Sequence, residues 1–273
     1  MLSLFKIRTV AVFEIRTLLR SWFFRIFSLL AILILVLLNI VFFVSKGSAI
    51  WTLRGISSSA PYFNLLLLNV VQAIIGIFMA SDFFKFDKKL DTTDVIYMRS
   101  MTNADYVLGK TLGVFTLFFS LNFLILILAF VFNFFFVDSP VVAAVYLFYP
   151  LFISIPTLAF IFGLSFLCMV ILRSQAITFI VLLGYIATTL FIIGSKFHYL
   201  FDYMTFNVPL MYSDFVGFGD ITSILIHRGI YLSFGLGFIF ITVLFIKRLP
   251  QSRIMNKVSL ALSILLILNG LNL

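Results

Sequence analysis

Six long stretches of nearly uninterrupted apolar residues divide the chain. Each approaches or exceeds the roughly 20 residues that a helix needs to cross the hydrocarbon core of a bilayer, which is about 30 Å thick. The polar segments between them are short, so we expect an all-α fold, a polytopic transmembrane helical bundle. The six predicted spans are residues 23–44, 61–80, 111–137, 146–172, 177–194 and 230–246.

A seventh apolar run, residues 258–273, is short for a span. Three interpretations stay open for it: a last helix, a helix lying in the membrane interface, or a span whose continuation is missing. Pro150 and Pro156 lie in the fourth predicted span. They predict a kinked or non-helical start there, because proline has no N–H to donate within a helix.

Basic residues alternate between the loops in a way that orients the spans. Lys and Arg are concentrated before the first span, between the second and third, and after the sixth. Such residues favour the cytoplasmic side of a membrane, so the pattern predicts six spans with the N-terminus in the cytoplasm. The alternate loops hold only Lys46, Arg54, Lys196 and Arg228.

Residues 3–21, before the first span, have the pattern of an amphipathic helix. We expect this helix to lie in the cytoplasmic interface with its basic face toward lipid headgroups. The alternative is a solvated juxtamembrane helix without a function of its own. The apolar face consists of Leu4, Ile7, Ala11, Ile15 and Leu18, and the opposite face of Lys6, Thr9, Arg16, Thr17 and Arg20.

Residues 81–110 are the longest polar stretch and hold five of the ten acidic residues. Asp91 or Thr92 is a suitable cap for a short helix that runs to about Met101, with Val95 and Met98 on its apolar side. A short amphipathic helix on the cytoplasmic side is typical of a docking element. The alternative is a connecting loop whose charges only set the topology.

Residues 195–229 form an aromatic-rich segment on the outer side. Pro209, Gly217 and Gly219 interrupt it, so we expect short helices that dip into the outer interface rather than a span. His198 and His227 both lie here. Their wide separation favours ordinary interfacial residues over metal ligands.

Composition supports a membrane protein. The chain is 63% hydrophobic and only 11% charged, with 37 phenylalanines. A soluble domain has about 25% charged residues to cover its surface. The net charge of +9 is explained by topology, so we expect no nucleic-acid partner. Cys168 lies in an apolar run and is interpreted as a small buried hydrophobic residue.

The predicted spans hold no Asp, Glu, Lys, Arg or His at depth. Ion-coupled carriers keep ionisable groups there, and intramembrane hydrolases need a catalytic constellation. The sequence has no HExxH, GxSxG or P-loop pattern. We therefore expect a non-enzymatic protein whose energy comes from a partner. The buried amides are expected to bond between helices, and they are Asn39, Asn69, Gln72, Asn122 and Asn133.

Residues Leu90 to Lys110, LDTTDVIYMRSMTNADYVLGK, resemble the loop before the third span in permease subunits of type-2 ATP-binding-cassette (ABC) exporters. Leu108-Gly109-Lys110 fits the pattern, and Asp94 stands for its acidic residue. Thr92-Thr93 replaces a Gly-Thr pair, and Ser100-Met101 replaces a Ser-Pro pair. The order of elements over residues 1–248 also resembles that family.

The resemblance implies a permease that forms the export pathway in the bacterial plasma (inner) membrane, paired with a second copy or a paralogue. ATP and magnesium would bind a separate ATPase subunit, with no cofactor on this chain. Residues 1–248 would be the permease domain, with 3–21 beside the ATPase, and 249–273 a cytoplasmic linker and terminal apolar segment. The implied coupling residues are Asp91, Thr92, Thr93, Asp94, Val95, Met98, Arg99, Asp105 and Lys110.

Two other functions remain open from the sequence. A non-transporting membrane scaffold of an envelope assembly also needs a docking loop, but it needs no substrate pathway. A membrane-embedded lipid enzyme needs a catalytic constellation that the sequence lacks. The transported substrate is not determined by the sequence, and membrane lipid is the other expected partner.

Overall fold

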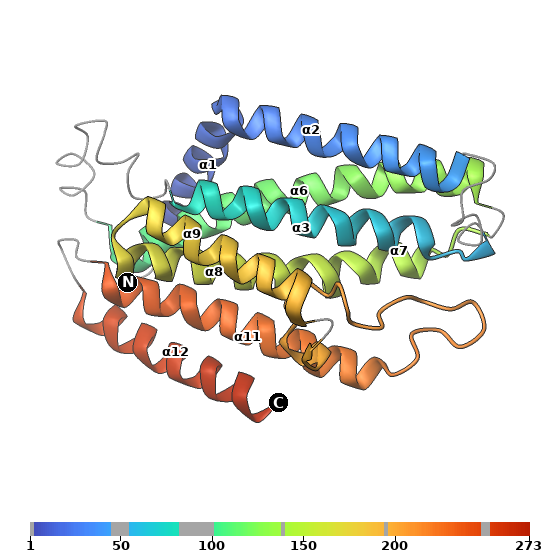
Figure 1. Cartoon of the computed structure of the whole chain (residues 1–273). Coiled ribbons are helices and arrows are strands. Elements are labelled where there is room, and N and C mark those ends of the chain that lie inside the picture. Colours follow the sequence, from blue (N-terminus) through green and yellow to red (C-terminus); the bar gives the residue numbers. More distant parts are fainter. Residues whose placement is uncertain (1–2, 45–54, 82–100, 138–139, 194–195, 247–251) are drawn as a thin grey trace.

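The computed structural model describes residues 3–44, 55–81, 101–137, 140–193, 196–246 and 252–273. Long helices form one bundle, and successive long helices run in alternating directions (Figure 1). The elements η1, η3 and η4 are π-helical turns, and η5 is a short 3-10 helix. The elements are α1 (Leu4–Arg20), α2 (Trp22–Asn39), η1 (Ile40–Val44), α3 (Ser59–Ser81), α6 (Asn103–Phe136), α7 (Ala143–Tyr149), η3 (Pro150–Ser154), α8 (Ile155–Leu172), α9 (Gln175–Thr188), η4 (Thr189–Ile193), η5 (Tyr199–Phe201), α11 (Ile221–Phe245) and α12 (Arg253–Asn272).

Seven stretches of helix in the described part of the chain are long and apolar enough to cross a membrane. The chain is therefore an all-α, multi-pass membrane protein, as the hydrophobic pattern predicts. Six of the seven coincide with the predicted spans. The seventh is α12, where the sequence leaves three interpretations open, and it packs along α11.

The two ends of the bundle are chemically different. At the end where α6 begins and α11 ends, the Asn103 Nδ2 donates to the Ile246 carbonyl oxygen at 2.9 Å. We call this the joint end, which lies on the left in Figure 1. The opposite end carries residues 196–220, which precede α11, and we call it the loop end.

Two predicted boundaries are wrong. The third span begins at Asn103, because Thr102 and Asp105 form a capping box that starts α6 eight residues before the predicted span. The sixth begins at Ile221, where the Asp220 carboxylate accepts from the Ser223 N–H. The predicted outer loop, residues 195–229, therefore ends at Asp220, and its last nine residues belong to α11.

The irregularity expected at Pro150 and Pro156 is the π-helical turn η3, which joins α7 to α8. Pro150 is its first residue, and Pro156 follows at the second position of α8. Neither proline can donate a backbone hydrogen bond, so the regular helical pattern is interrupted at both positions. Residues 143–172 thus cross the bundle as one interrupted helix.

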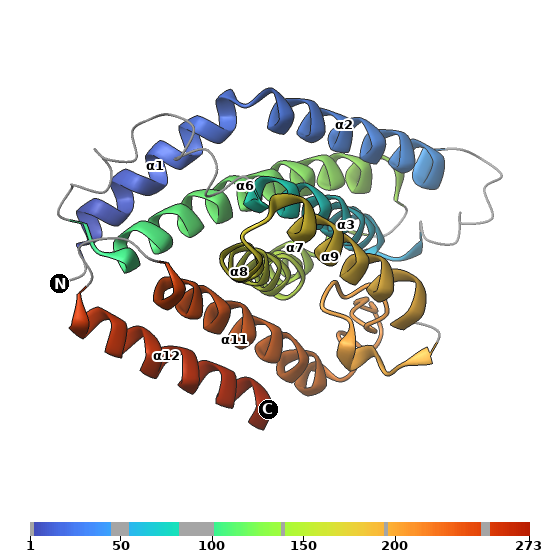
Figure 2. The ribbon, with the colours of Figure 1, turned by 60° about the vertical axis from the view of Figure 1, so that its left-hand side comes forward.

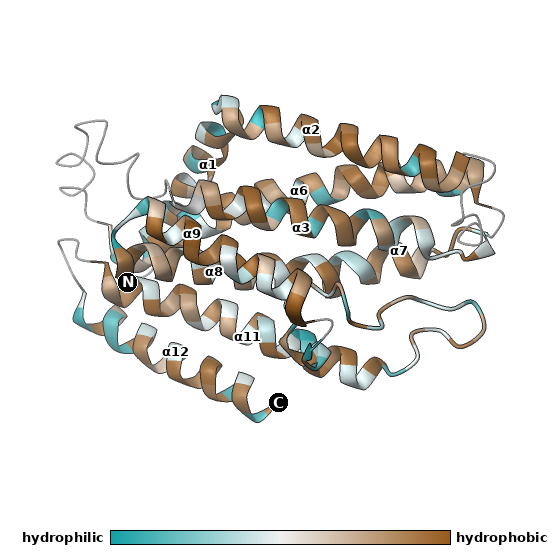
Figure 3. Ribbon diagram, in the orientation of Figure 1, coloured by the Kyte–Doolittle hydropathy of each residue, from teal (hydrophilic) through white to brown (hydrophobic). Residues whose placement is uncertain are grey.

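Helices α3 and α8 form the centre of the bundle. In the most apolar window of α3, and in that of α7–α8, 61% of the residues are buried, compared with 22% for α2 and for α12. The peripheral α2 is hydrophobic along most of its length (Figure 3). Its exposed leucines and isoleucines lie on the outside of the bundle. Such an apolar surface is suited to contact with lipid tails.

Small residues allow α11 to pack closely on two neighbours. On one side Gly235 crosses α8 at Gly163, and a Cβ on Gly163 would lie 2.3 Å from the Gly235 carbonyl oxygen. On the other side Gly229 and Gly237 contact α12, with Ser233 between them. Glycine or serine at every fourth position brings helix backbones together in membranes.

Helix α1 turns away from α2 at Ser21 and lies along the first part of α6 (Figure 2). The two helices run parallel, since Ile7 and Val10 contact Gly109, whereas Ala11 and Glu14 contact Gly113. The predicted helix at residues 3–21 is confirmed. Its apolar face is used in part for packing on α6, with Ile7 and Leu18 buried.

The crossing of α8 and α11 generates a stability prediction. Gly235→Ala places a Cβ 2.5 Å from the Ala159 carbonyl carbon, so we expect a loss of about 1–3 kcal/mol or more from overpacking. Gly184→Ala is the matched control, because no atom lies within 4 Å of its Cβ. It should stabilise α9 by up to about 1 kcal/mol, since alanine is the better helix former.

Thermal unfolding of both variants in the same detergent, followed by gel filtration, measures the effect. The midpoint should fall for Gly235→Ala and stay level or rise for Gly184→Ala. Equal midpoints for the two variants would show that α8 and α11 do not cross at Gly235.

Candidate functional site

The candidate coupling residues divide between the described and undescribed parts of the chain. Residues 91–99, which include Asp94 and Arg99, lie outside the described ranges. Asp105 and Lys110 are described, and both are buried in the first turns of α6. Neither side chain forms part of the surface, so any role in coupling acts through the helices that they join.

Asp105 joins the start of α6 to the start of α1. Its carboxylate accepts from the Thr102 N–H at 3.1 Å and completes the capping box. The same carboxylate accepts from the Ser3 N–H at 2.9 Å. One buried acid therefore satisfies free backbone donors at the beginnings of two helices.

Lys110 forms an ion pair with Glu14 of α1, with 3.7 Å between Nζ and Oε2. Both side chains are at most one-tenth exposed, so water screens their attraction little. The Lys110 Nζ also lies 5.3 Å from the centre of the Tyr106 ring. Gly109 and Gly113 lack side chains at the contact with α1. The ion pair and the close backbones fasten α1 to α6.

A chain of buried polar groups crosses the middle of the bundle. Gln72 of α3 donates to the Phe118 carbonyl of α6 at 2.9 Å, and its own Oε1 accepts from Asn122 at 3.0 Å. The Ser154 hydroxyl of η3 donates to the Asn122 Oδ1 at 2.8 Å. The expectation that the buried amides bond between helices is thus confirmed.

Arg228 is a fully buried cation within α11, in the part of that helix that the sequence assigned to the outer loop rather than to the sixth span. Its guanidinium donates to the Phe152 carbonyl of η3, to the Ile153 carbonyl at 3.1 Å and to the Thr157 hydroxyl at 2.7 Å. A fourth bond reaches the Tyr203 carbonyl at 3.0 Å. Arg228 follows His227, and these two polar residues lower the local hydropathy, so the predicted span begins only at residue 230.

The bond to Phe152 has a cause in the sequence. Pro156 has no N–H, so it cannot donate to the carbonyl four residues earlier, which is that of Phe152. A buried carbonyl without a donor costs several kcal/mol in a membrane interior. Arg228 supplies the missing donor from the neighbouring helix. Asn69 of α3 also donates to the Ile153 carbonyl, at 3.2 Å.

The loop end contacts Arg228 through the Tyr203 carbonyl. The buried Asp202 carboxylate accepts from the Met204 N–H at 2.9 Å and from the Asn207 N–H at 2.6 Å. Burial raises the pKa of Asp202 above its ordinary value, and the positive charge of Arg228 partly opposes that rise. Asp202 thus folds residues 202–207 into the turn that presents the Tyr203 carbonyl to Arg228.

Three further contacts hold residues 211–214 against the bundle. The Tyr212 N–H donates to the Tyr149 hydroxyl oxygen at 2.8 Å, and Ser58 donates to the Tyr212 carbonyl at 2.6 Å. The Ser57 hydroxyl donates to the Asp214 carboxylate. The start of α3 and the end of α7 are therefore fixed by the loop.

Some buried polar atoms have no hydrogen-bond partner among the described residues. They include both ring nitrogens of His227, the hydroxyl of Tyr203 and the Oδ1 of Asn69. His227 packs edge-on against Tyr231, with 5.1 Å between ring centres. No acid or nucleophile bonds to this imidazole, so the arrangement provides no acid–base pair.

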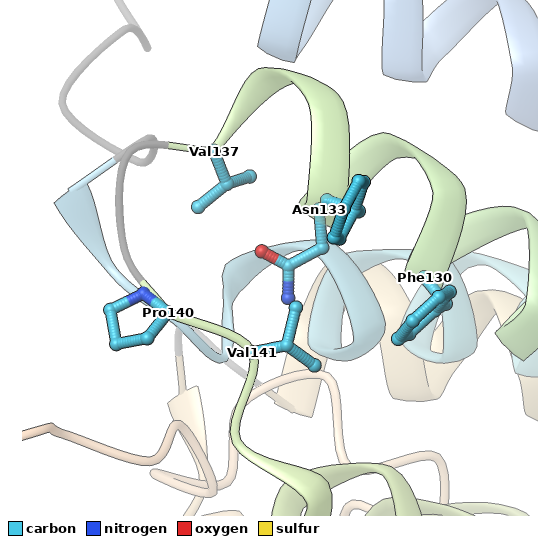
Figure 4. Close-up of a pocket in the computed structure, with 6 residues that line it drawn as sticks. Phe130, Asn133, Val137, Pro140 and Val141 are labelled. Carbon is cyan, nitrogen blue, oxygen red and sulfur yellow. The ribbon is translucent and has the colours of Figure 1, made fainter.

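An open apolar groove of about 390 Å³ lies where α6 ends, beside the start of α7. Asn133 lies between Val137, Pro140 and Val141 (Figure 4). Its Nδ2 donates to the Ser57 carbonyl at 3.1 Å and to the Tyr146 hydroxyl at 3.0 Å. Asn133 therefore ties α6 to α3 and α7, and the groove carries no charged side chain among its lining residues.

The described residues contain no group of three His, Cys, Asp or Glu that could hold a metal ion. Cys168 is half-buried, and its thiol is free. The polar groups of the interior are instead used to join helices. No protein-family model matches the chain, and a search of curated proteins finds no significant relative.

Three contacts were not predicted from the sequence, although each left a signal there. Gly109 and Gly113 form a GxxxG pattern, which indicates a helix packed closely nearby. Glu14 is the sole acid before Asp82, and an isolated acid in an amphipathic helix needs a partner. The signal for Arg228 was weaker. Pro156 leaves the Phe152 carbonyl without its backbone donor, but the sequence does not show which residue replaces that donor.

The bonding of Arg228 predicts the effect of its removal. Arg228→Met should lower the free energy of unfolding by about 3 kcal/mol, because the Phe152 carbonyl loses its side-chain donor and the Ile153 and Tyr203 carbonyls each lose one of theirs. Arg228→Lys should recover little of the lost stability, since one ammonium cannot reach all the acceptors of the planar guanidinium. The exposed Arg253→Met is the control, and unfolding in detergent with a chemical denaturant is the measurement. A wild-type midpoint for Arg228→Met would contradict the assignment.

The ion pair at the joint end predicts a non-additive pair of variants. Glu14→Met or Lys110→Met alone should destabilise the α1–α6 contact by about 3–5 kcal/mol, because each removes one partner of a buried ion pair and keeps the other charge buried. The double variant should be more stable than either single variant, since it leaves no charge. Protease cleavage of α1 in detergent measures this. Additive losses would show that the two groups do not interact.

Proposed function

We propose that the chain is the membrane-spanning permease subunit of an ABC exporter. In this proposal it forms the translocation pathway with a second copy or a paralogue. A separate ATPase subunit binds ATP and magnesium and supplies the energy. The bundle of apolar helices and the local resemblance in residues 90–110 support the proposal.

The fastening of α1 to α6 is the observation that carries the proposal. The segment from Asp91 to about Met101, which the sequence predicts to dock a partner, lies just before α6 in the chain. The first turns of α6 are joined to α1 through Asp105 and the Glu14–Lys110 pair, and to the end of α11 through Asn103. In this proposal, a force applied at residues 91–101 acts on α6, α1 and α11 together, as coupling to an external ATPase requires.

The charges of the interior agree with an external energy source. All three side-chain nitrogens of Arg228 donate hydrogen bonds, to three carbonyl oxygens and one hydroxyl. A proton- or sodium-coupled carrier needs a carboxylate or a similar group that changes its occupancy during transport. Arg228 is instead engaged in holding η3 and the loop end together.

Affinity capture of the tagged chain from the native membrane in mild detergent tests the proposal. We expect a P-loop ATPase to co-purify in stoichiometric amounts. The capture should fail for the Asp94→Ala, Arg99→Ala double variant, because the docking segment loses both charges. The Asp138→Ala, Arg253→Ala double variant removes one acid and one base elsewhere and should capture the ATPase normally.

Three outcomes count against the proposal. If both double variants lose the ATPase, the docking segment is wrongly placed. If no ATPase co-purifies but another envelope protein does, the chain is a membrane scaffold. If the chain is captured alone from its native membrane, it has no stable ATPase partner and the permease assignment fails.

A further inference from the structure

Helix α1 has two faces with different surroundings. The face formed by Ile7, Glu14 and Leu18 is buried, and residues of this face and its flank contact α6. The opposite face carries Phe5, Val12 and Leu19, which are 79%, 38% and 46% exposed. Residues seven apart lie nearly above one another on a helix, so these three form a continuous apolar strip.

Arginines lie on both sides of this apolar strip. Arg8 lies on one side, and Arg16 and Arg20 lie on the other, at the angles that 100° per residue gives them. All three side chains are exposed and form no ion pair with the described residues. The sole acid of α1, Glu14, is buried and paired with Lys110. The outer face is therefore positive, and no acid of the described residues pairs with its arginines.

Neither water nor the hydrocarbon core suits this face. In water, the apolar strip would lie exposed at a cost proportional to its area. In hydrocarbon, three arginines would lie unpaired. At 1.5 Å per residue the 34 residues of α6 extend over about 51 Å, well beyond the roughly 30 Å of a bilayer core. The first turns of α6, with α1 beside them, therefore fit the interface between lipid tails and water.

We propose that the outer face of α1 is a binding surface for anionic phospholipid headgroups. Phe5, Val12 and Leu19 insert between the upper parts of the lipid tails. Arg8, Arg16 and Arg20 extend from either side to lipid phosphates, with their aliphatic stems along the strip. The occupant is a net-negative lipid, because a zwitterionic headgroup leaves the charge of this face uncompensated. The inference does not depend on an ATPase partner.

Native mass spectrometry of the purified full-length chain tests this inference. The chain is released from micelles that contain dioleoyl phosphatidylglycerol and dioleoyl phosphatidylcholine in equal amounts. We expect phosphatidylglycerol to be retained preferentially. The Arg8→Gln, Arg16→Gln, Arg20→Gln triple variant should lower its retention at least tenfold, since each basic residue near a membrane surface contributes a factor of about five.

The matched control is the Arg173→Gln, Arg253→Gln, Lys257→Gln triple variant, which removes the same charge from exposed positions outside α1. It should retain phosphatidylglycerol as the wild type does. A Phe5→Ser, Val12→Ser, Leu19→Ser variant keeps the arginines and should retain less of both lipids, because the strip no longer inserts.

Equal retention of the two lipids by the wild type would overturn the inference. So would equal losses in the two charge variants, which would indicate a general effect of net charge. If the α1 charge variant keeps its lipids but loses a co-purifying protein, the face binds that protein instead. Failure of the ATPase capture leaves this result unaffected, because the lipid experiment uses the isolated chain.

Discussion

The structure depends on one constraint: every backbone carbonyl in the interior of a membrane bundle needs a donor. Pro156 removes one donor, and the π-helical turn at residues 150–154 changes the spacing of the bonds around it. Arg228, Asn69 and Thr157 supply donors to the carbonyls at 152 and 153. Because these donors come from α11, α3 and α8, the break in one helix determines how three helices are packed.

The same constraint explains the loop end. Arg228 has a donor left after filling the carbonyls of η3, and the Tyr203 carbonyl accepts it. The turn around Asp202 positions that carbonyl, because the Asp202 carboxyl accepts from the Met204 and Asn207 N–H groups. Carbonyl and hydroxyl oxygens thus take the place of a carboxylate around the buried guanidinium of Arg228.

The sequence was sufficient to predict the helical class and six spans, because hydrophobic length alone determines them. It failed at the starts of α6 and α11, where Thr102–Asp105 and Asp220 begin helices among polar residues that lower the local hydropathy. The interhelical role of Gln72 and Asn122 follows from their residue type, but their partners do not. The ion pair of Glu14 with Lys110 joins residues 96 positions apart, and contacts of that range depend on packing.

Helix α1 connects the chemistry of the joint end to the membrane surface. One face is fixed to α6 by a buried ion pair and two glycine contacts, and the other is proposed to bind anionic lipid. If the chain is a permease, as proposed, and α6 occupies two positions in its cycle, α1 moves with α6 and its arginines change their depth in the headgroup layer. Lipid then favours the position in which those arginines reach more phosphates. The size of this preference equals the difference between the free energies of lipid binding in the two positions. A lipid bound equally well in both positions would hold α1 at the surface and leave the transport equilibrium unchanged.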